Sequence, residues 1–356
     1  MKIVSVVGAR PQFVKLAPVA EALRRAGHQH VIVHTGQHYD ARMSDVFFDD
    51  LAIPTPDVHL GIGSGSHGAQ TGRMLAELDP VLDQQHPDWV LVYGDTNSTM
   101  AAALASVKLH LPVAHLEAGL RSFNRGMPEE HNRVLTDHAS DLLLAPTALA
   151  MDNLAREGLS GRSSLVGDVM ADICLRVQRM VRGQRSAPVV AQVGDGDYVL
   201  ATLHRPANTD DPDRLASVIG ALRELEVPVL LTAHPRLVDR AAVAGVRLDG
   251  GALRTVPPLS YPDMVAAVDG ARAVVTDSGG LQKEAYLLST SCTTLRTETE
   301  WPETLHAGWN VLLADDPSDL GWVALRPPPD EPVGTPYGNG RAAEAAVAAL
   351  HVDPHG

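Results

Sequence analysis

The chain has 356 residues, a length that exceeds one ordinary hydrophobic core and predicts two domains. Hydrophobic residues make up 45% and charged residues 20%, as in globular proteins, and no apolar run is long enough to span a membrane. The formal net charge of −14 argues against an extended basic surface, so we expect neither a nucleic-acid nor a membrane partner. A small anionic substrate stays compatible with this charge, because a few local arginines suffice to bind it. We expect a cytoplasmic protein, because nothing near the N-terminus reads as a signal peptide.

Strand-like and helix-like stretches alternate from the first residue. Short β-branched or apolar runs predict strands at residues 2–7, 31–34, 89–93 and 112–116. Amphipathic or alanine-rich stretches predict helices at 13–25 and from Thr96 or Asn97 to 107. This order predicts a parallel sheet with helices on both faces.

The same pattern restarts after Gly167, with predicted strands at 198–203, 227–232 and 273–276. We therefore expect a first Rossmann-like domain over residues 1–167 and a second over 168–330. The tail, 331–356, contains an alanine-rich helix that is expected to cross back to the first domain. Ligands of open α/β sheets bind beyond the carboxyl ends of the strands, so we expect the two parallel sheets to face a central cleft.

The first predicted strand runs into a loop that contains Arg10 and Pro11. Proline suits the first turn of a helix, where its missing N–H costs nothing. Arg10 and, one turn further on, Lys15 are then expected to face the ligand, and a helix N-terminus with two cations favours phosphate. The alternative is a surface arginine and a solvated lysine.

A second loop, Asp277-Ser278-Gly279-Gly280, follows the predicted strand 273–276 and precedes a helix. Paired glycines let the backbone approach a ligand closely, and the helix offers free N–H groups to a diphosphate. The loop matches neither a Walker motif nor the GxGxxG fingerprint, which disfavours NTP hydrolysis and nicotinamide binding. Glu284, in the first turns of the helix, is placed to hold two ribose hydroxyls. The alternative is a plain strand–helix turn.

Acidic residues end successive predicted strands of the first domain. Asp95 and Glu117 each follow a strand, and Glu129 lies in the next loop. We expect the three to converge on one sugar, with His204 and Arg205 arriving from the second domain. Converging acids shift one another's pKa, which supplies an acid and a base together for moving a proton on and off carbon.

Two further features concern an additional cation and a possible metal site. Arg236 follows the predicted strand 227–232 and is expected to add a cation to the cleft. His28, His30, His34 and His38 straddle another strand without consistent ligand geometry, so we expect no metal.

Together, these segments resemble the non-hydrolysing UDP-N-acetylglucosamine 2-epimerase family. The matching segments follow one another over nearly the whole chain: VGARPQFVK (7–15), TGQHY (35–39), GDT (94–96), HLEAGLR (115–121), PEEHNR (128–133), TLHR (202–205), TDSGGLQ (276–282) and RTETEWPE (296–303).

The resemblance implies a glycosyltransferase-B-like fold, a homodimer, and a reaction without metal or nicotinamide cofactors. UDP leaves to give a 2-acetamidoglucal and adds back with the opposite configuration at C2, which interconverts UDP-GlcNAc and UDP-ManNAc. The catalytic residues implied in this way are Asp95, Glu117, Glu129, Arg133 and His204. The implied UDP site contains Arg10, Lys15, Ser278, Gly279, Gly280, Glu284 and Arg296, to which we add Arg205 and Arg236. The motif does not decide whether Glu117 or Asp95 removes the C2 proton.

Three departures bear on substrate details. The family often carries Glu two residues after the Arg of its His-Arg motif, where this chain has Ala207, and Thr297 replaces a common Asp. The segment between residues 121 and 128 is shorter than in many bacterial members. These departures also put in question a second, regulatory UDP-sugar site, for which the candidate residues are Gln37, Gln70 and Arg73.

Three other functions compete with this interpretation. A hydrolysing 2-epimerase shares the motifs but releases N-acetylmannosamine and UDP. A glycosyltransferase of the same architecture would not exchange the C2 proton, and the acid-rich first domain argues against it. A catalytically silent UDP-sugar-binding protein would not need the acids at all.

Overall fold

A computed structural model describes residues 1–37, 54–183, 186–194, 196–313 and 316–351, with the backbone alone at 10, 187 and 190. His38 and Tyr39 of the expected motif lie outside these ranges. The chain divides into two compact units, of which unit 1 comprises Met1–Ile173 with Thr335–Gly356 and unit 2 comprises Cys174–Gly334. Within the described residues, no helix is long and apolar enough to cross a membrane.

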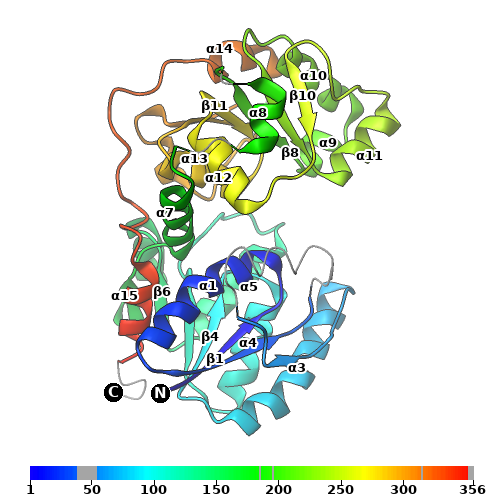
Figure 1. Ribbon diagram of the computed structural model, residues 1–356. Coiled ribbons are helices and arrows are strands. Elements are labelled where there is room, and N and C mark those ends of the chain that lie inside the picture. The colour runs from blue at the N-terminus through cyan, green and yellow to red at the C-terminus, as the bar shows by residue number, and fades with distance from the viewer. Residues whose placement is uncertain (38–53, 184–185, 195, 314–315, 352–356) are drawn as a thin grey trace. The chain divides into compact units, whose positions relative to one another are not determined.

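Unit 1 contains a seven-stranded parallel sheet in the order β3-β2-β1-β4-β5-β6-β7 (Figure 1). Its elements are β1 (Lys2–Val7), α1 (Arg10–Arg25), β2 (Gln29–His34), β3 (Val58–His59), α3 (His67–Gln85), β4 (Trp89–Tyr93), α4 (Asn97–Lys108), β5 (Val113–Leu116), α5 (Pro128–Ala139), β6 (Leu142–Ala145), α6 (Ala148–Arg156), the 3₁₀ helix η1 (Ser160–Arg162), β7 (Ser163–Leu165) and α15 (Ala342–Ala349).

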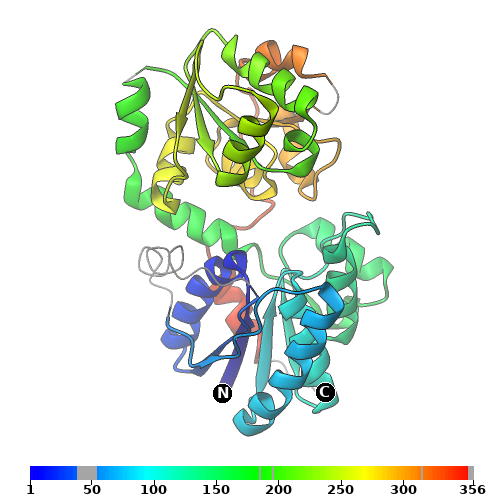
Figure 2. The same ribbon diagram turned by 90° about the vertical axis from the view of Figure 1, so that its right-hand side faces the viewer.

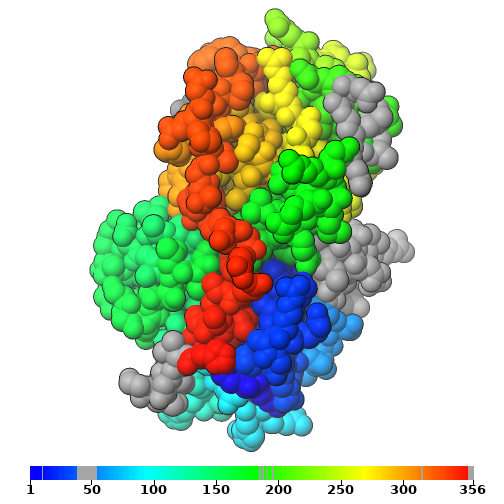
Figure 3. Space-filling view, turned by 60° about the vertical axis from the view of Figure 1, so that its left-hand side comes forward, coloured from blue at the N-terminus to red at the C-terminus, as the bar shows by residue number. Residues whose placement is uncertain are grey.

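The sheet of unit 1 is covered on both faces. Helix α1 lies on one face, and α3 and α4 lie on the other (Figure 2). The α3–α4 face buries valines of β1, β2 and β4 against leucines of α3 and alanines of α4. The C-terminal helix α15 packs alongside α1 (Figure 3). Fully buried parallel strands need apolar side chains on both faces, which is why these strands read as continuous apolar runs.

Unit 2 repeats this architecture with a six-stranded parallel sheet in the order β10-β9-β8-β11-β12-β13. Its elements are α8 (Ala187–Val193), β8 (Val199–Leu203), α9 (Pro206–Thr209), α10 (Pro212–Arg223), β9 (Val229–Ala233), α11 (Pro235–Ala244), β10 (Leu253–Val256), α12 (Tyr261–Asp269), β11 (Ala273–Thr276), α13 (Gly279–Leu287), β12 (Ser291–Thr294), η2 (Pro302–Gly308), β13 (Asn310–Leu312), η3 (Pro317–Asp319) and α14 (Leu320–Ala324). Helix α7 (Val169–Val181) begins in unit 1 and ends in unit 2.

Two Rossmann-like domains with parallel sheets are therefore confirmed. Local signals explain several element starts: Pro11 lies in the first turn of α1, and the Thr96 side chain caps α4 by accepting a hydrogen bond from the Thr99 N–H. Gly8 is required by packing, because a Cβ there would lie 2.1 Å from the hydroxyls of both Thr35 and Ser98.

Candidate active site

The strand order changes direction between β1 and β4 in unit 1 and between β8 and β11 in unit 2. At such a switch point, the loops after the two central strands diverge and leave room for a ligand beyond the carboxyl ends. Asp95 follows β4, and His204 and Ser278 follow β8 and β11. Of the residues expected from the sequence, these three lie at the switch point of their own unit.

In unit 1, Lys15 of α1 forms an ion pair with Glu117, whose carboxylate lies 2.6 Å from the ammonium group. Both side chains are about 10% exposed, so the pair is largely shielded from water. Burial alone would lower the pKa of Lys15, but Glu117 and then Asp95 reverse that effect and raise it. Lys15 is therefore a cation at neutral pH, paired with the Glu117 carboxylate.

The backbone around this pair is unusual. Glu117 itself has a φ of +73°, a left-handed conformation that side chains rarely adopt and that costs about 1–3 kcal/mol. Gly94 also has a positive φ, and a Cβ there would approach the Lys15 ammonium to 3.0 Å. In this left-handed conformation the Glu117 carboxylate pairs with Lys15.

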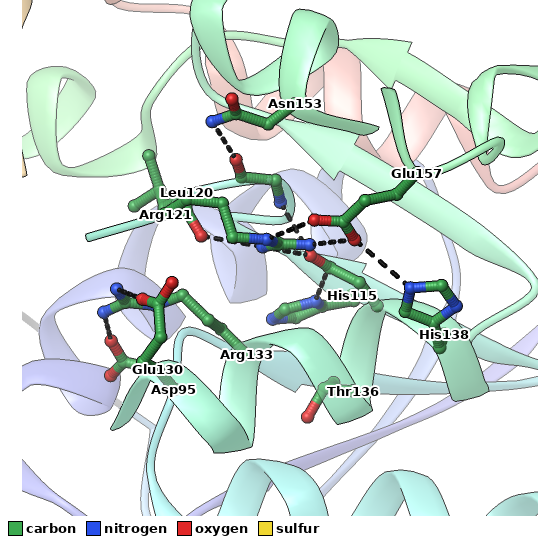
Figure 4. A network of polar contacts seen from close by, with 12 residues as sticks. Asp95, His115, Leu120, Arg121, Glu130, Arg133, Thr136, His138, Asn153 and Glu157 are labelled. Carbon is green, nitrogen blue, oxygen red and sulfur yellow. Dashed lines mark hydrogen bonds and ion pairs between the residues drawn. The ribbon is translucent and has the colours of Figure 1, made fainter. Parts of the chain in front are cut away.

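Two acidic side chains contact Arg133 of α5. Its guanidinium forms ion pairs with both Asp95 and Glu130, the latter at 2.8 Å (Figure 4). Glu130 also accepts hydrogen bonds from the Ser122 and Phe123 N–H groups, and these together with Arg133 hold its pKa below the ordinary value although burial opposes them. Each of these carboxylates therefore has a basic partner.

Glu129, which the motif implies, lies exposed in the first turn of α5, whereas its neighbour Glu130 is buried. Sequence reasoning missed Glu130. Glu130 accepts hydrogen bonds from backbone N–H groups of the preceding loop and so fixes the conformation of that loop. The sequence Pro-Glu-Glu alone does not reveal which of its two glutamates makes these hydrogen bonds.

In unit 2, Asp277 is a buried hub at the carboxyl end of β11. Its carboxylate accepts hydrogen bonds from the N–H groups of His204 and Arg205 and lies 2.9 Å from Nδ1 of His204. Burial would raise the pKa of Asp277, but His204 and the backbone donors keep it lowered. The His204 ring is 45% exposed, so Asp277 orients an accessible imidazole.

The loop after β11 has the geometry expected of an anion site. Ser278 caps α13, whose first helical residues are Gly279 and Gly280. A Cβ at Gly279 would lie 2.2 Å from the Glu300 carboxylate, which contacts Arg296 at 2.7 Å and Arg205 at 3.9 Å. A carboxylate of the chain itself therefore lies between two arginines at a helix N-terminus, and sequence reasoning had not singled out Glu300.

The remaining predicted residues lie as follows. Glu284 is buried within α13. Arg236 lies in the first turn of α11 in an exposed ion pair with Asp210, and this pair lowers the pKa of Asp210. The side chain of Arg10 lies outside the described part of the structure, and its backbone begins α1. Among the described residues, no group of three or more His, Cys, Asp or Glu side chains has the arrangement of a metal site.

Two parallel-sheet units, with acids and cations at the switch point of one and a glycine-rich helix start in the other, define a glycosyltransferase-B-like enzyme for nucleotide sugars. A family model described as UDP-N-acetylglucosamine 2-epimerase matches residues 21–351. The chain belongs to this family, and it is therefore an isomerase.

Relatives agree over nearly the full length. The chain is 44% identical to a UDP-N-acetylglucosamine 2-epimerase homolog of Methanococcus maripaludis, over 98% of this chain and 99% of that protein. It is 47% identical to the UDP-2,3-diacetamido-2,3-dideoxy-D-glucuronate 2-epimerase of Pseudomonas aeruginosa, over 88% of each chain. The crystal structure of Methanocaldococcus jannaschii UDP-GlcNAc 2-epimerase in complex with UDP-GlcNAc and UDP superposes with a TM-score of 0.86 at 38% identity, covering 98% and 99% of the two chains.

Proposed function

We propose that this enzyme is a non-hydrolysing UDP-N-acetylglucosamine 2-epimerase that interconverts UDP-GlcNAc and UDP-ManNAc. The observation that carries the proposal is the shielded Lys15–Glu117 ion pair at the switch point of unit 1, with Asp95 held by Arg133 nearby. A carboxylate held in place by a fixed side chain is a suitable base for removing a proton from carbon.

In the proposed reaction, Glu117 takes the C2 proton while the C1–O bond breaks. The electron pair of the C–H bond forms the C1–C2 double bond, and UDP leaves with the electrons of the C1–O bond. The products are 2-acetamidoglucal and UDP. In the reverse addition, an acid returns a proton to the opposite face of C2 as UDP attacks C1. Asp95, Glu129 and His204 are the candidates for this acid, and Arg133 orients Asp95.

Unit 2 supplies the proposed UDP site. The free N–H groups at the start of α13, with Ser278, Gly279 and Gly280, suit the diphosphate, and Arg205 and Arg296 add positive charge. Glu284 is proposed to hold the ribose. Lys15 lies against Glu117, so we place it with the catalytic acids rather than with UDP. We also propose that Arg10 and Arg236 contact the phosphates of UDP.

A cytoplasmic homodimer is part of the proposal. The homodimer rests on the family resemblance. The compartment is supported by Cys174 and Cys292, which are both buried thiols. Analytical ultracentrifugation of the purified chain tests the dimer.

Proton NMR of the enzyme with UDP-GlcNAc in heavy water tests the reaction. A second UDP-linked sugar, with deuterium at C2 of both epimers, is expected. Free N-acetylmannosamine with UDP would instead establish the hydrolysing reaction. Binding without exchange would overturn the proposed substrate or reaction.

A second candidate substrate is UDP-2,3-diacetamido-2,3-dideoxy-D-glucuronate. It is favoured by the 47% identity to the Pseudomonas aeruginosa enzyme of that name. Measuring kcat/KM for each nucleotide sugar at the same enzyme concentration decides between the two, because the true substrate is expected to have the higher kcat/KM.

A further inference from the structure

His115 of β5 is fully buried between two hydrogen-bond acceptors. Its Nδ1 lies 2.7 Å from a carboxylate oxygen of Asp137, and its Nε2 lies 2.7 Å from the carbonyl oxygen of Gly94. A carbonyl oxygen only accepts hydrogen bonds, so Nε2 must carry a proton. The protonation of Nδ1 then depends on the state of Asp137.

Asp137 is an anion in this arrangement. Its second oxygen lies 2.7 Å from the Arg121 guanidinium and accepts a hydrogen bond from the Gly119 N–H at 3.1 Å. Burial would raise the pKa of Asp137, but His115 and then Arg121 keep it below its ordinary value. An anionic carboxylate also only accepts, so Nδ1 must be protonated as well.

We propose that His115 is a positioning residue that fixes the two loops carrying Asp95 and Glu117 by donating a hydrogen bond from each ring nitrogen. This inference rests on the proposed function, because holding the two loops in place matters for catalysis only if Asp95 and Glu117 take part in the reaction. His115 does not touch the substrate; it acts through the backbone.

The backbone contacts show how it would act. The Gly94 N–H donates to the Leu116 carbonyl at 3.0 Å, while the Gly94 carbonyl receives Nε2 of His115. The residue just before Asp95 is thus held on both sides by β5, which ends just before Glu117. On the other side of the ring, Asp137 holds the Gly119 N–H, two residues after Glu117.

The outer part of the network anchors this ring. Arg121 contacts both oxygens of Glu157 at 2.7 Å, and Glu157 is 3.2 Å from the exposed His138 (Figure 4). In the view of Figure 4, His115 lies near the middle of this network and His138, which is exposed, lies at its right-hand end. A buried hydrogen-bonding group is tolerated when its partners are fixed, and here Asp137, the partner of Nδ1, is itself held by Arg121.

The protonation state is tested on the wild-type enzyme. Histidine-detected nitrogen NMR is expected to show a proton on each ring nitrogen of His115, one hydrogen-bonded to Asp137 and the other to the Gly94 carbonyl. The signal is assigned by its loss in His115→Gln, and neutron diffraction locates the same two protons without any variant. A bare ring nitrogen on His115 would overturn the proposal.

The positioning role is tested by kinetics. His115→Gln keeps a donor for Gly94 but none for Asp137, and we expect kcat to fall about 100-fold, as for a displacement of the reacting groups by about 1 Å. The KM for substrate and the Kd for UDP are expected to stay unchanged. The matched control is His138→Gln, the same substitution at the exposed rim of the network, with unchanged kcat.

Unchanged kcat in a folded His115→Gln variant, or a loss shared equally by UDP binding, would overturn the positioning role. These outcomes differ from failure of the proposed function. If the wild-type enzyme epimerises neither UDP-sugar, the proposed function fails, whereas the protonation of His115 is still read directly by NMR.

Discussion

Lys15 and Glu117 are 102 positions apart in the sequence and meet in a 2.6 Å ion pair beside Gly94, where α1 approaches the end of β5. Neither residue has a charged neighbour in the sequence that would indicate this pairing. The ion pair follows from the topology, because β4 separates β1 from β5 by one strand and the loops after these strands share one edge of the sheet.

Glu117→Gln tests the proposed base. The amide keeps the size of the side chain and the left-handed backbone but cannot take a proton, so kcat is expected to fall about 10²- to 10⁴-fold. UDP affinity, measured by calorimetry, is expected to persist. The control is Glu21→Gln, which removes an acid of α1 from an exposed ion pair with Arg25 and should leave kcat unchanged. Retained deuterium exchange at C2 in Glu117→Gln would exclude Glu117 as the base.

Lys15 is tested by two substitutions of opposite character. Lys15→Met leaves Glu117 shielded without its cation, a change that costs about 3–5 kcal/mol for a fully buried pair and less here. We expect a lower melting temperature of unit 1 and a lower kcat, because the proposed base loses the partner that holds it in place. Lys15→Arg keeps the charge and should recover part of both losses. An unchanged kcat and melting temperature in Lys15→Met would contradict this role of Lys15.

The neighbours Glu129 and Glu130 are expected to have separate roles. Glu129→Gln alters an exposed side chain, so its effect should appear in kcat and not in the melting temperature. Glu130→Gln weakens the contacts to Arg133, Ser122 and Phe123, so it should lower the melting temperature. Circular dichroism and the deuterium-exchange assay on both variants separate the two roles. A stability loss in Glu129→Gln with none in Glu130→Gln would reverse the assignment.

The sequence indicated the fold and the positions of the site loops because each depends on local signals. Apolar runs mark buried parallel strands, and Thr96 and Pro11 mark helix starts. The partners of the site residues were not predictable in the same way. Glu300 approaches Gly279 from a distant loop, and Asp137 reaches His115 from α5. Such contacts depend on how elements pack in three dimensions, which periodicity and spacing do not encode.

His34 makes the stability of unit 1 depend on pH. Burial, with a smaller effect of His59, lowers the pKa of His34 to about 4, and its ring is stacked between Phe13 and His59. The unfolded chain takes up a proton near pH 6.5 while the folded chain does not, so stability falls as pH drops from about 6.5 to about 4. The slope from one such group is at most about 1.4 kcal/mol per pH unit.

His34→Phe is expected to reduce that slope. Hydrogen exchange of the β2 amides at pH 7 and pH 5 measures it, and the variant should lose less protection than the wild type. His30 has a pKa lowered to about 4 by burial as well, so part of the slope should persist in the variant. Equal losses of protection in the two proteins would show that His34 does not contribute.

Glu300 is expected to compete with the diphosphate for its site. Its carboxylate lies against Gly279 and between Arg296 and Arg205, which are the groups proposed to receive phosphate oxygens. Two anions cannot share these donors, so UDP must displace the carboxylate. Glu300→Gln removes the competing charge, and we expect tighter UDP binding. Calorimetry on the variant and the wild type measures the change in Kd. If Glu300 instead holds the arginines in place for UDP, the same variant will bind UDP more weakly, and Arg296→Gln will show no further loss when combined with it.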